Sequence, residues 1–315
     1  MARYLVTGGG GFIGSNLVEA ILRRGDDVRV LDNFATGRRA NLEAAPSWAD
    51  AGRSRFELID GDIRDASACR RAVDGCDFVL HQAAIPSVQR SVLDPVATNE
   101  VNVDGTLHVL AAARDAKVRR VVLASSSSIY GESETLPKVE TMPSAPISPY
   151  GLQKLAGETY AIVFHRLYGL PAIALRYFNV FGPRQDPGSE YSAVIPKFIA
   201  AIRAGQAPTI YGDGEQTRDF TYVDNVVRAN LQACEAGEDA LGQAFNIACG
   251  ERISLNALVA ILAGFNGREV KPKHEPARPG DIRHSLAGID KARRLLGFAP
   301  TTSSREGLRR TWDAK

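Results

Sequence analysis

The sequence contains few cysteines, and their spacing argues against two classes of protein. The four that are present, Cys69, Cys76, Cys234 and Cys249, form neither a CxxC pair nor a metal-ligand pattern. A disulfide framework or a zinc site would require such spacing. We therefore expect reduced thiols, which are typical of a cytoplasmic protein, and no metal site.

The sequence also lacks a long apolar segment, an export signal and an excess of charge. No apolar run is long enough to span a bilayer. The chain enters an apolar strand at Arg3 without a basic region or a cleavage site. Lys and Arg number 38 and Asp and Glu number 36, which leaves a net charge of +2. This balance provides no strong field for nucleic acid or membrane, so we expect neither as a partner.

A glycine-rich turn joins the first strand to the first helix. The apolar residues 4–6 precede Gly8, Gly11 and Gly14, and a second apolar strand ends at Asp32. Glycines so placed let the backbone approach a pyrophosphate, whose charge then lies at a helix N-terminus. Asp32 can accept hydrogen bonds from the adenosine ribose and would repel a 2′-phosphate. The pattern predicts a dinucleotide site that prefers NAD to NADP.

Strands and helices alternate through the first half of the chain. Apolar strands are expected over residues 56–59, 78–81, 120–125 and 171–177, with long helices over 95–116 and 149–169. This alternation predicts the α/β class, with a Rossmann-type doubly wound parallel sheet. The length also favours a smaller α/β substrate-binding lobe, because single cores stop growing near ~250–300 residues. We assign residues 1–178 plus about 219–250 to the nucleotide-binding domain, and about 179–218 plus 251–315 to the lobe.

Polar residues follow the ends of the predicted strands, where such sheets bind ligands. Asp62 could bind the adenine amino group, or it could cap the helix over residues 66–73. His81 is expected to be packed and hydrogen-bonded at a strand end rather than to act as a base. The small residues of Gln82-Ala83-Ala84 would allow the backbone to come close to the cofactor.

Tyr150 and Lys154 lie four residues apart at the start of a helix, so their side chains share one face. A phenol titrates near ~10, and a neighbouring cation would lower that pKa. Alone, this spacing is typical of an exposed tyrosine beside a solvated lysine. The four serines at 125–128 are typical of a loop, but their place before this helix could bring a hydroxyl and the phenol to one substrate oxygen.

Together these motifs resemble the extended short-chain dehydrogenase/reductases, and among them the UDP-hexose 4-epimerases, over almost the whole chain. The resemblance rests on Thr7-Gly-x-x-Gly-x-x-Gly14, Asp32, Gly61-Asp62-Ile63, Asn102, the serines before Tyr130-Gly131, Tyr150-x-x-x-Lys154 and Arg176-Tyr-Phe-Asn179. It implies tightly held NAD and inversion of carbon 4 of a UDP-sugar. The implied cofactor-binding residues are Gly8, Gly11, Phe12, Ile13, Gly14, Asp32, Asn33, Asp62, Ile63, Gln82, Ala83, Ala84, Asn102, Ser125, Tyr150, Lys154 and Tyr177.

The same resemblance implies roles at the substrate. Tyr150 would take the proton of the sugar 4-hydroxyl, Lys154 would hold the nicotinamide ribose, and Ser126, or alternatively Ser127, would bridge the phenol and the sugar oxygen. The implied substrate-binding residues are Ser87, Ser126, Ser127, Tyr150, Asn179, Val194, Tyr211, Arg218, Arg278, Asp281 and Ser285. Among these, the arginines and Asn179 would bind the diphosphate, Asp281 the uridine ribose and Tyr211 the uracil.

Two positions narrow the implied reaction. Related 4,6-dehydratases carry an Asp-Glu pair where this chain has Ser127 and Ser128. Epimerases restricted to galactose carry a bulky tyrosine where this chain has Ser285, which would leave room for a 2-acetamido group. The resemblance therefore implies UDP-GlcNAc/UDP-GalNAc, with UDP-Glc/UDP-Gal as a further pair.

The same motifs are compatible with two other functions, and the resemblance also implies a homodimer. A UDP-glucuronate 4-epimerase or decarboxylase, or another NDP-sugar epimerase, would have the same fold and motifs. In a glucuronate enzyme, Arg90 and Ser87 could bind the carboxylate of the sugar. A non-catalytic NAD-sensing protein is the remote alternative. Such proteins can lose the tyrosine–lysine pair, whereas this chain has both Tyr150 and Lys154. Family members commonly dimerise, which here implies a homodimer through the helices at 95–116 and 149–169.

Overall fold

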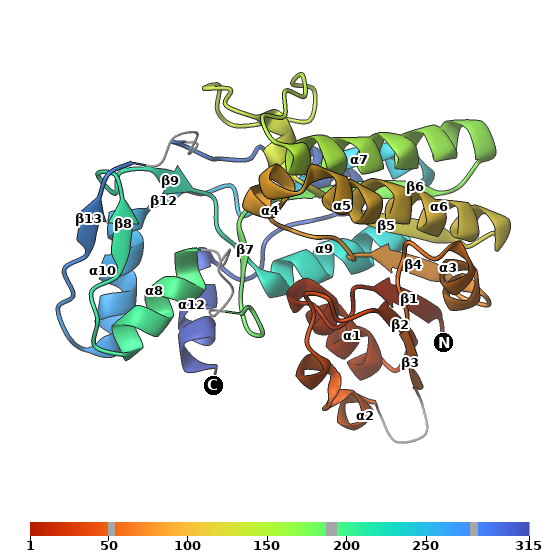
Figure 1. The fold of residues 1–315 in the computed structure, drawn as a ribbon, viewed down its shortest axis with the longest axis horizontal. Coiled ribbons are helices and arrows are strands. Elements are labelled where there is room, and N and C mark those ends of the chain that lie inside the picture. Colours follow the sequence, from red (N-terminus) through yellow and green to blue (C-terminus); the bar gives the residue numbers. More distant parts are fainter. Residues whose placement is uncertain (50–53, 187–193, 278–282, 315) are drawn as a thin grey trace.

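A seven-stranded sheet forms the centre of the computed structural model, which describes residues 1–49, 54–186, 194–277 and 283–314 (Figure 1). The strands are β1 (Arg3–Thr7), β2 (Asp27–Asp32), β3 (Phe56–Asp60), β4 (Phe78–His81), β5 (Arg120–Ser126), β6 (Ala172–Tyr177) and β11 (Gln243–Ile247). Their order is β11-β6-β5-β4-β1-β2-β3, and every neighbouring pair is parallel. The order reverses between β1 and β4, which is where a doubly wound sheet binds its ligand.

Helices cover both faces of this sheet. One face carries α3 (Ala66–Val73), α6 (Thr106–Asp115) and α7 (Pro149–Tyr168), and the other carries α1 (Phe12–Arg23), α9 (Val223–Glu235) and α11 (Asp290–Leu296). Successive strand residues point to opposite faces, so Leu5 and Val79 pack in one buried cluster while Val6 and Leu80 pack in the other. The predicted Rossmann-type doubly wound fold is confirmed.

The expected helix over 95–116 is helical from Pro95 to Asp115, but it is not an α-helix throughout, because a π-helical turn interrupts it. Its parts are α5 (Pro95–Asn99), a π-helical turn over Glu100–Gly105, and α6. The π-helical turn contains Asn102, whose side chain accepts from the Ile85 backbone at 2.8 Å and donates to its carbonyl at 3.2 Å. Such turns are frequent at functional sites, and this one holds the loop after β4. A further short helix, α4 (Val88–Leu93), precedes α5.

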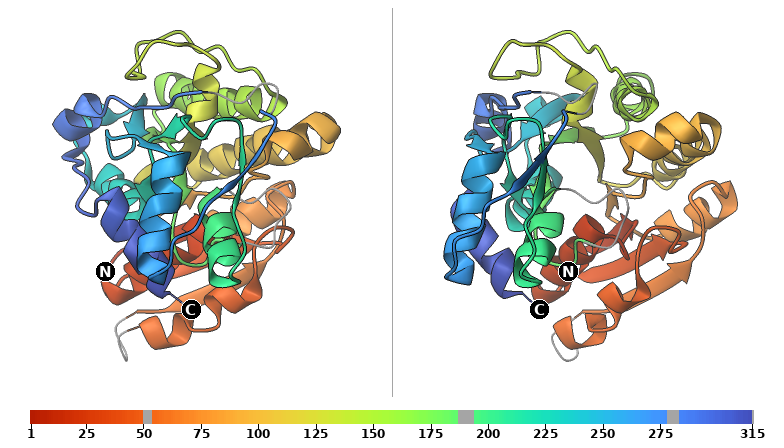
Figure 2. Two further views of the ribbon diagram at one scale, coloured as in Figure 1. Left: turned by 90° about the vertical axis from the view of Figure 1, so that its left-hand side faces the viewer. Right: turned by 60° about the vertical axis from the view of Figure 1, so that its left-hand side comes forward.

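A smaller group of elements lies to one side of the sheet (Figure 2). Its strands form three short pairs: β7 (Val180–Phe181) with β10 (Thr221–Tyr222), β8 (Thr209–Tyr211) with β13 (Lys273–Glu275), and β9 (Thr217–Arg218) with β12 (Ile253–Ser254). Its helices are α8 (Val194–Arg203), α10 (Leu255–Asn266) and α12 (Ser304–Asp313). The remaining elements are α2 (Ala45–Trp48) and 3₁₀ turns over Arg39–Leu42, Ser127–Tyr130 and Glu238–Ala240.

The structure also bears on membrane spans, metal sites and disulfides. Within the described residues, no helix combines the length and apolarity needed to cross a membrane. The same residues contain no group of three His, Cys, Asp or Glu side chains arranged to hold a metal ion. All four cysteines lie in the described part of the chain and are free thiols.

Candidate active site

The glycine turn after β1 is packed too closely to accept side chains. Gly8 has φ +71°, and a Cβ there would lie 2.7 Å from the Ala83 nitrogen. A Cβ on Gly14 would lie 2.1 Å from the Gly8 carbonyl oxygen. In the described structure the N-cap of α1, Gly11, has no side-chain cap, so the helix presents its first N–H groups to the turn. This backbone cradle fits the pyrophosphate of NAD.

Gly14→Ala tests the cradle and should raise the Kd for NAD by about 10- to 100-fold, since overpacking costs about 1–3 kcal/mol. Calorimetric titration of NAD into cofactor-stripped protein would measure it. Gly264→Ala is the matched control, because Gly264 also lies in a helix and no described atom would come within 4 Å of its Cβ. An unchanged Kd for Gly14→Ala would contradict the assignment of the cradle.

Asp32 lies beside the cradle at the end of β2. Its carboxylate accepts the backbone N–H groups of Gly10 at 2.8 Å and Phe34 at 2.7 Å. Burial raises its pKa, while the two backbone hydrogen bonds act in the opposite direction. The carboxylate is therefore held against the turn, where a 2′-phosphate on a bound dinucleotide would be repelled.

Asp62 is not the cap of α3, so that alternative is wrong. Asp65 caps this helix by accepting the Ser67 N–H at 2.7 Å, because Asp65 is the residue directly before its first turn. Asp62 instead accepts from Asn33 at 2.8 Å and from Arg64 at 2.8 Å. Its hydrogen bond with Arg64 is the main reason that its pKa falls to about 2. The carboxylate stays charged and is held near Asn33 at the end of β3.

His81 is a packed strand-end residue, as expected. Its two ring nitrogens lie 2.7 Å from Thr7 Oγ1 and 2.9 Å from Thr106 Oγ1. Burial, with a smaller effect from Lys154, lowers its pKa to about 3. The ring is therefore neutral at ordinary pH and has both nitrogens engaged.

Several predicted cofactor residues have side chains that are engaged by the protein itself. Gln82 donates to Asn230 at 3.1 Å and accepts from the Tyr177 hydroxyl at 3.2 Å. Asn102 is bonded to the loop after β4, as described, and Ser125 donates to Glu158 at 2.7 Å. Asn230 lies on α9, far from these residues in sequence, so the pattern of motifs gave no signal for it. These bonds fix the loops around the cradle.

Tyr150 and Ser126 are brought together at the carboxyl end of β5. Helix α7 begins as predicted, with Ser148 accepting the Gly151 N–H at 3.1 Å and Pro149 in the first turn. The Tyr150 N–H donates to Ser91 Oγ at 3.0 Å. The Ser126 side chain lies close enough to the Tyr150 phenol to act on its pKa, in the direction that favours the phenolate. Of the two serines left open by the sequence, Ser126 is therefore the one that contacts the phenol.

Lys154 does not lower the pKa of Tyr150 below its ordinary value in this structure. Burial raises the pKa of the phenol, and only the Ser126 side chain acts against that rise. The Lys154 ammonium donates to the Ala124 carbonyl at 3.0 Å, and burial lowers its own pKa to about 8. Tyr150 and Lys154 do lie on one face of α7, as their spacing predicts. The spacing does not determine where the Lys154 ammonium points.

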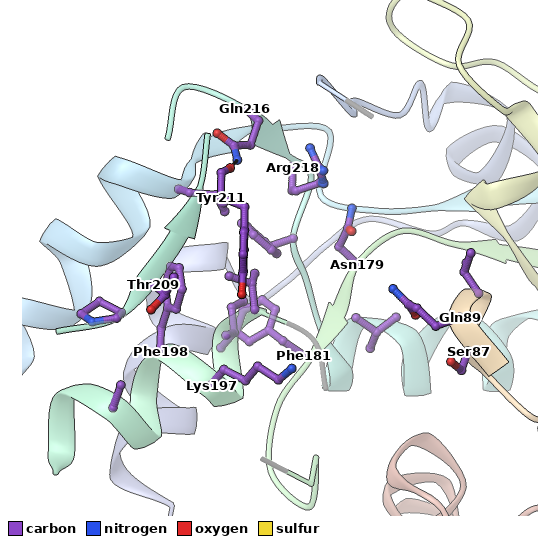
Figure 3. A pocket seen from close by; sticks show the side chains of 18 of the residues that line it. Ser87, Gln89, Asn179, Phe181, Lys197, Phe198, Thr209, Tyr211, Gln216 and Arg218 are labelled. Atoms are coloured by element: carbon purple, nitrogen blue, oxygen red, sulfur yellow. Dashed lines mark hydrogen bonds between the residues drawn. The ribbon is translucent and has the colours of Figure 1, made fainter. Parts of the chain in front are cut away.

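A cavity of about 770 Å³ lies between the sheet and the smaller group of elements. Its volume is within the range of ~300–1,000 Å³ usual for small-molecule sites. Five of the predicted substrate residues line it: Ser87, Asn179, Val194, Tyr211 and Arg218. Figure 3 shows Arg218 and Asn179 next to each other on its wall, with Tyr211 extending toward Lys197. The cavity therefore combines cations with an aromatic ring.

Residues that sequence reasoning missed also line this cavity, namely Gln89, Lys197, Phe198 and Gln216. The local sequence gave no indication of these residues. Lys197 and Phe198 lie on α8, whose sequence is that of an ordinary amphipathic helix. Asn179 adopts φ +34°, and its side chain donates to the Asp219 carbonyl at 3.1 Å. The Ser87 hydroxyl accepts the Arg90 N–H at 3.1 Å and so caps α4.

The remaining predicted substrate residues lie elsewhere. The Ser285 N–H donates to the Thr217 carbonyl at 3.1 Å, which places Ser285 beside the strand that carries Arg218. Ser127 opens the 3₁₀ turn after β5. Arg278 and Asp281 lie outside the described residues.

The comparisons with known proteins show the family of this chain. The NAD dependent epimerase/dehydratase family matches residues 4–248, and the chain belongs to this family. A UDP-glucose 4-epimerase of Mycolicibacterium smegmatis is 40% identical, with 98% of this chain and 97% of the relative covered.

Two solved structures share the fold over nearly the whole chain. One is a UDP-N-acetylglucosamine 4-epimerase from Methanobrevibacter ruminantium in complex with UDP-N-acetylmuramic acid, with a TM-score of 0.91, 39% identity, and coverage of 99% of this chain and 97% of that one. The other is a Thermus thermophilus UDP-glucose 4-epimerase complex with NAD, with a TM-score of 0.86, 38% identity, and coverage of 99% and 98%.

Proposed function

We propose that this protein is an NAD-dependent epimerase that inverts carbon 4 of a UDP-sugar. The observation that carries the proposal is the contact between Ser126 and the Tyr150 phenol, with Lys154 one turn further along the helix. This group lies at the carboxyl end of β5, on the same edge of the sheet as the glycine cradle. Family membership and the named relatives support the same activity.

The chain's own residues would bind, orient and move one proton. NAD, when bound, supplies reversible oxidation of carbon 4. As a phenolate, Tyr150 would accept the proton of the 4-hydroxyl and return it later, while Ser126 would donate a hydrogen bond to the same oxygen. Because burial raises the pKa of this phenol, the phenolate requires added positive charge, which the Lys154 ammonium and the oxidised nicotinamide of bound NAD would supply. The Lys154 ammonium, with a pKa of about 8, is available to hold the nicotinamide ribose. Because the cofactor returns to its starting state, it need not leave between turnovers.

Support for a UDP-sugar comes from the cavity. Arg218 and Lys197 provide positive charge for a diphosphate, and the planar guanidinium suits bidentate bonds to phosphate oxygens. The Tyr211 ring lines the same cavity and would pack against uracil. Ser87 and Gln89 border the cavity from the start of α4, and Ser91 of that helix accepts the Tyr150 N–H. The sugar end of the cavity would therefore lie toward Tyr150.

The resemblance supports an N-acetylated sugar, because galactose-restricted epimerases carry a bulky tyrosine at the position of Ser285, which here lies beside β9. We expect Ser285→Tyr to lower kcat/KM for UDP-GlcNAc by about 10²-fold, because the larger ring occupies the space of the 2-acetamido group. UDP-glucose turnover should be spared, and Ser285→Ala should retain both activities. Initial rates with the two sugars would measure the discrimination. If Ser285→Tyr turns over both sugars as well as the wild type does, Ser285 is not the gate.

We further propose a homodimer that forms through α5, α6 and α7. Exposed apolar side chains on α5 and α7 support this, including Val96 at 69%, Leu152 at 58% and Leu167 at 70% exposure. Helices α5 and α7 contact each other, so they can contribute to one interface. Sedimentation velocity should give twice the chain mass, and Val96→Arg with Leu152→Arg should give the monomer. A monomeric wild type would contradict the dimer.

The domain boundaries and the compartment are also part of the proposal. We propose a nucleotide-binding domain of residues 1–178 plus about 219–250 and a substrate lobe of about 179–218 plus 251–315, although α11 of the last segment packs on the sheet of the first domain. The free thiols support a cytoplasmic location.

The activity is tested by incubating purified protein with each UDP-sugar without added reductant, and then separating the 4-epimers. Formation of UDP-GalNAc from UDP-GlcNAc would support the N-acetylated sugars as substrates. Product from UDP-glucuronate alone would favour the uronate enzyme instead.

A further inference from the structure

A buried ion pair lies behind the Ser126 and Tyr150 contact. Glu158 is 2% exposed and Arg176 is 5% exposed. Arg176 donates to the two carboxylate oxygens of Glu158, from Nη2 at 2.6 Å and from Nε at 3.0 Å. A buried pair of this kind gives little net stability over apolar packing, since desolvation offsets its attraction. The hydrogen bonds of this pair therefore say more about its role than its contribution to stability does.

Both ends of the segment 125–130, which contains the four serines, are bonded to this one ion pair. Ser125, directly before Ser126, donates to Glu158 Oε2 at 2.7 Å. Tyr130, at the end of the 3₁₀ turn that follows, accepts from Arg176 Nη1 at 2.7 Å. The Tyr130 hydroxyl also donates to Asn246 Oδ1 at 2.7 Å, which attaches the turn to β11.

The same ion pair fixes the helix that carries Tyr150. Tyr150, Lys154 and Glu158 follow one another at intervals of four residues, so they share one face of α7. Glu158 bonds to β5 through Ser125 and to β6 through Arg176. The position of α7 and the position of the segment 125–130 are thus set by one carboxylate.

We propose that the Glu158–Arg176 ion pair positions Ser126 against the Tyr150 phenol by fixing the segment 125–130 at both of its ends, Ser125 and Tyr130. Glu158, Arg176, Ser125 and Tyr130 act as positioning residues, and Ser126 and Tyr150 are the groups that touch substrate. The inference rests on the proposed epimerase activity. It gives a role to Glu158, Arg176 and Tyr130, and it adds a positioning role to Ser125, which the family resemblance places at the cofactor.

Ser125→Ala is the most selective test, because it removes one hydroxyl and leaves both Arg176 bonds to Glu158. We expect kcat to fall about 10- to 100-fold, the scale of a slightly misplaced catalytic group, with KM unchanged. Tyr130→Phe should lower kcat in the same way from the other end of the segment. Ser304→Ala is the control, because it removes an equally buried hydroxyl bond, to the Phe220 carbonyl at 2.9 Å, outside this group. It should leave kcat unchanged.

A double-mutant comparison separates positioning from stability. In a Ser126→Ala background, Ser125→Ala should lower kcat no further, because its effect passes through Ser126. A general loss of stability would persist in that background. An active wild type whose kcat is unchanged by both Ser125→Ala and Tyr130→Phe would overturn this inference alone. A wild type without epimerase activity would overturn the proposed function and this inference with it.

Discussion

Replacing Tyr150 by phenylalanine is expected to lower kcat by about 10²–10⁴-fold, the usual contribution of a positioned acid–base group. The substitution removes only the phenolic oxygen. The ring remains, and so does the backbone N–H that donates to Ser91. NAD should therefore stay bound while the proton of the sugar hydroxyl has no acceptor.

The rate loss must be measured together with cofactor content. Initial rates of epimer formation give kcat, and release of NAD by acid from the purified variant gives its occupancy. Tyr160→Phe is the matched control, because Tyr160 lies on the same helix and is 37% exposed. Undiminished kcat in Tyr150→Phe would remove Tyr150 from the mechanism.

Glu158→Ala should lower the free energy of unfolding by about 3–5 kcal/mol. The substitution leaves the Arg176 guanidinium buried without a counter-charge, and it also leaves the Ser125 hydroxyl without its acceptor. Urea unfolding of wild type and variant at the same NAD concentration would measure the difference, since bound ligand itself stabilises the folded state.

An exposed ion pair provides the control for this stability effect. Glu306 and Arg310 are four residues apart on α12 and approach to 2.8 Å, with about half of each side chain exposed. Glu306→Ala should cost only about 0–1 kcal/mol. Similar losses for Glu158→Ala and Glu306→Ala would show that the buried pair is not a rigid part of the site.

The strands, the glycine turn and the place of Asp32 could be predicted because they depend on local sequence. A strand, a glycine turn, a helix and an acid at the end of the next strand follow one another within the first 32 residues, and parallel strands place their carboxyl ends together. The start of α7 at Pro149 and the packing of His81 were also predictable from single positions.

Features that depend on distant contacts were not predictable. Asp65 rather than Asp62 caps α3, which depends on where the helix begins. The π-helical turn around Asn102 forms where its side chain bonds to the loop after β4. Glu158 looked like one more acid on a helix, and only the meeting of α7 with β6 pairs it with Arg176. A charged residue in an otherwise buried helix face was the one available signal.

The most direct test of carbon 4 inversion is to run the reaction in D₂O with UDP-GlcNAc and no added reductant, and to observe the product by proton NMR. The account predicts the 4-epimer with its carbon-bound hydrogen at position 4 retained, because only the hydroxyl proton passes through Tyr150. Deuterium on carbon 4, or no epimer from any UDP-sugar, would contradict it.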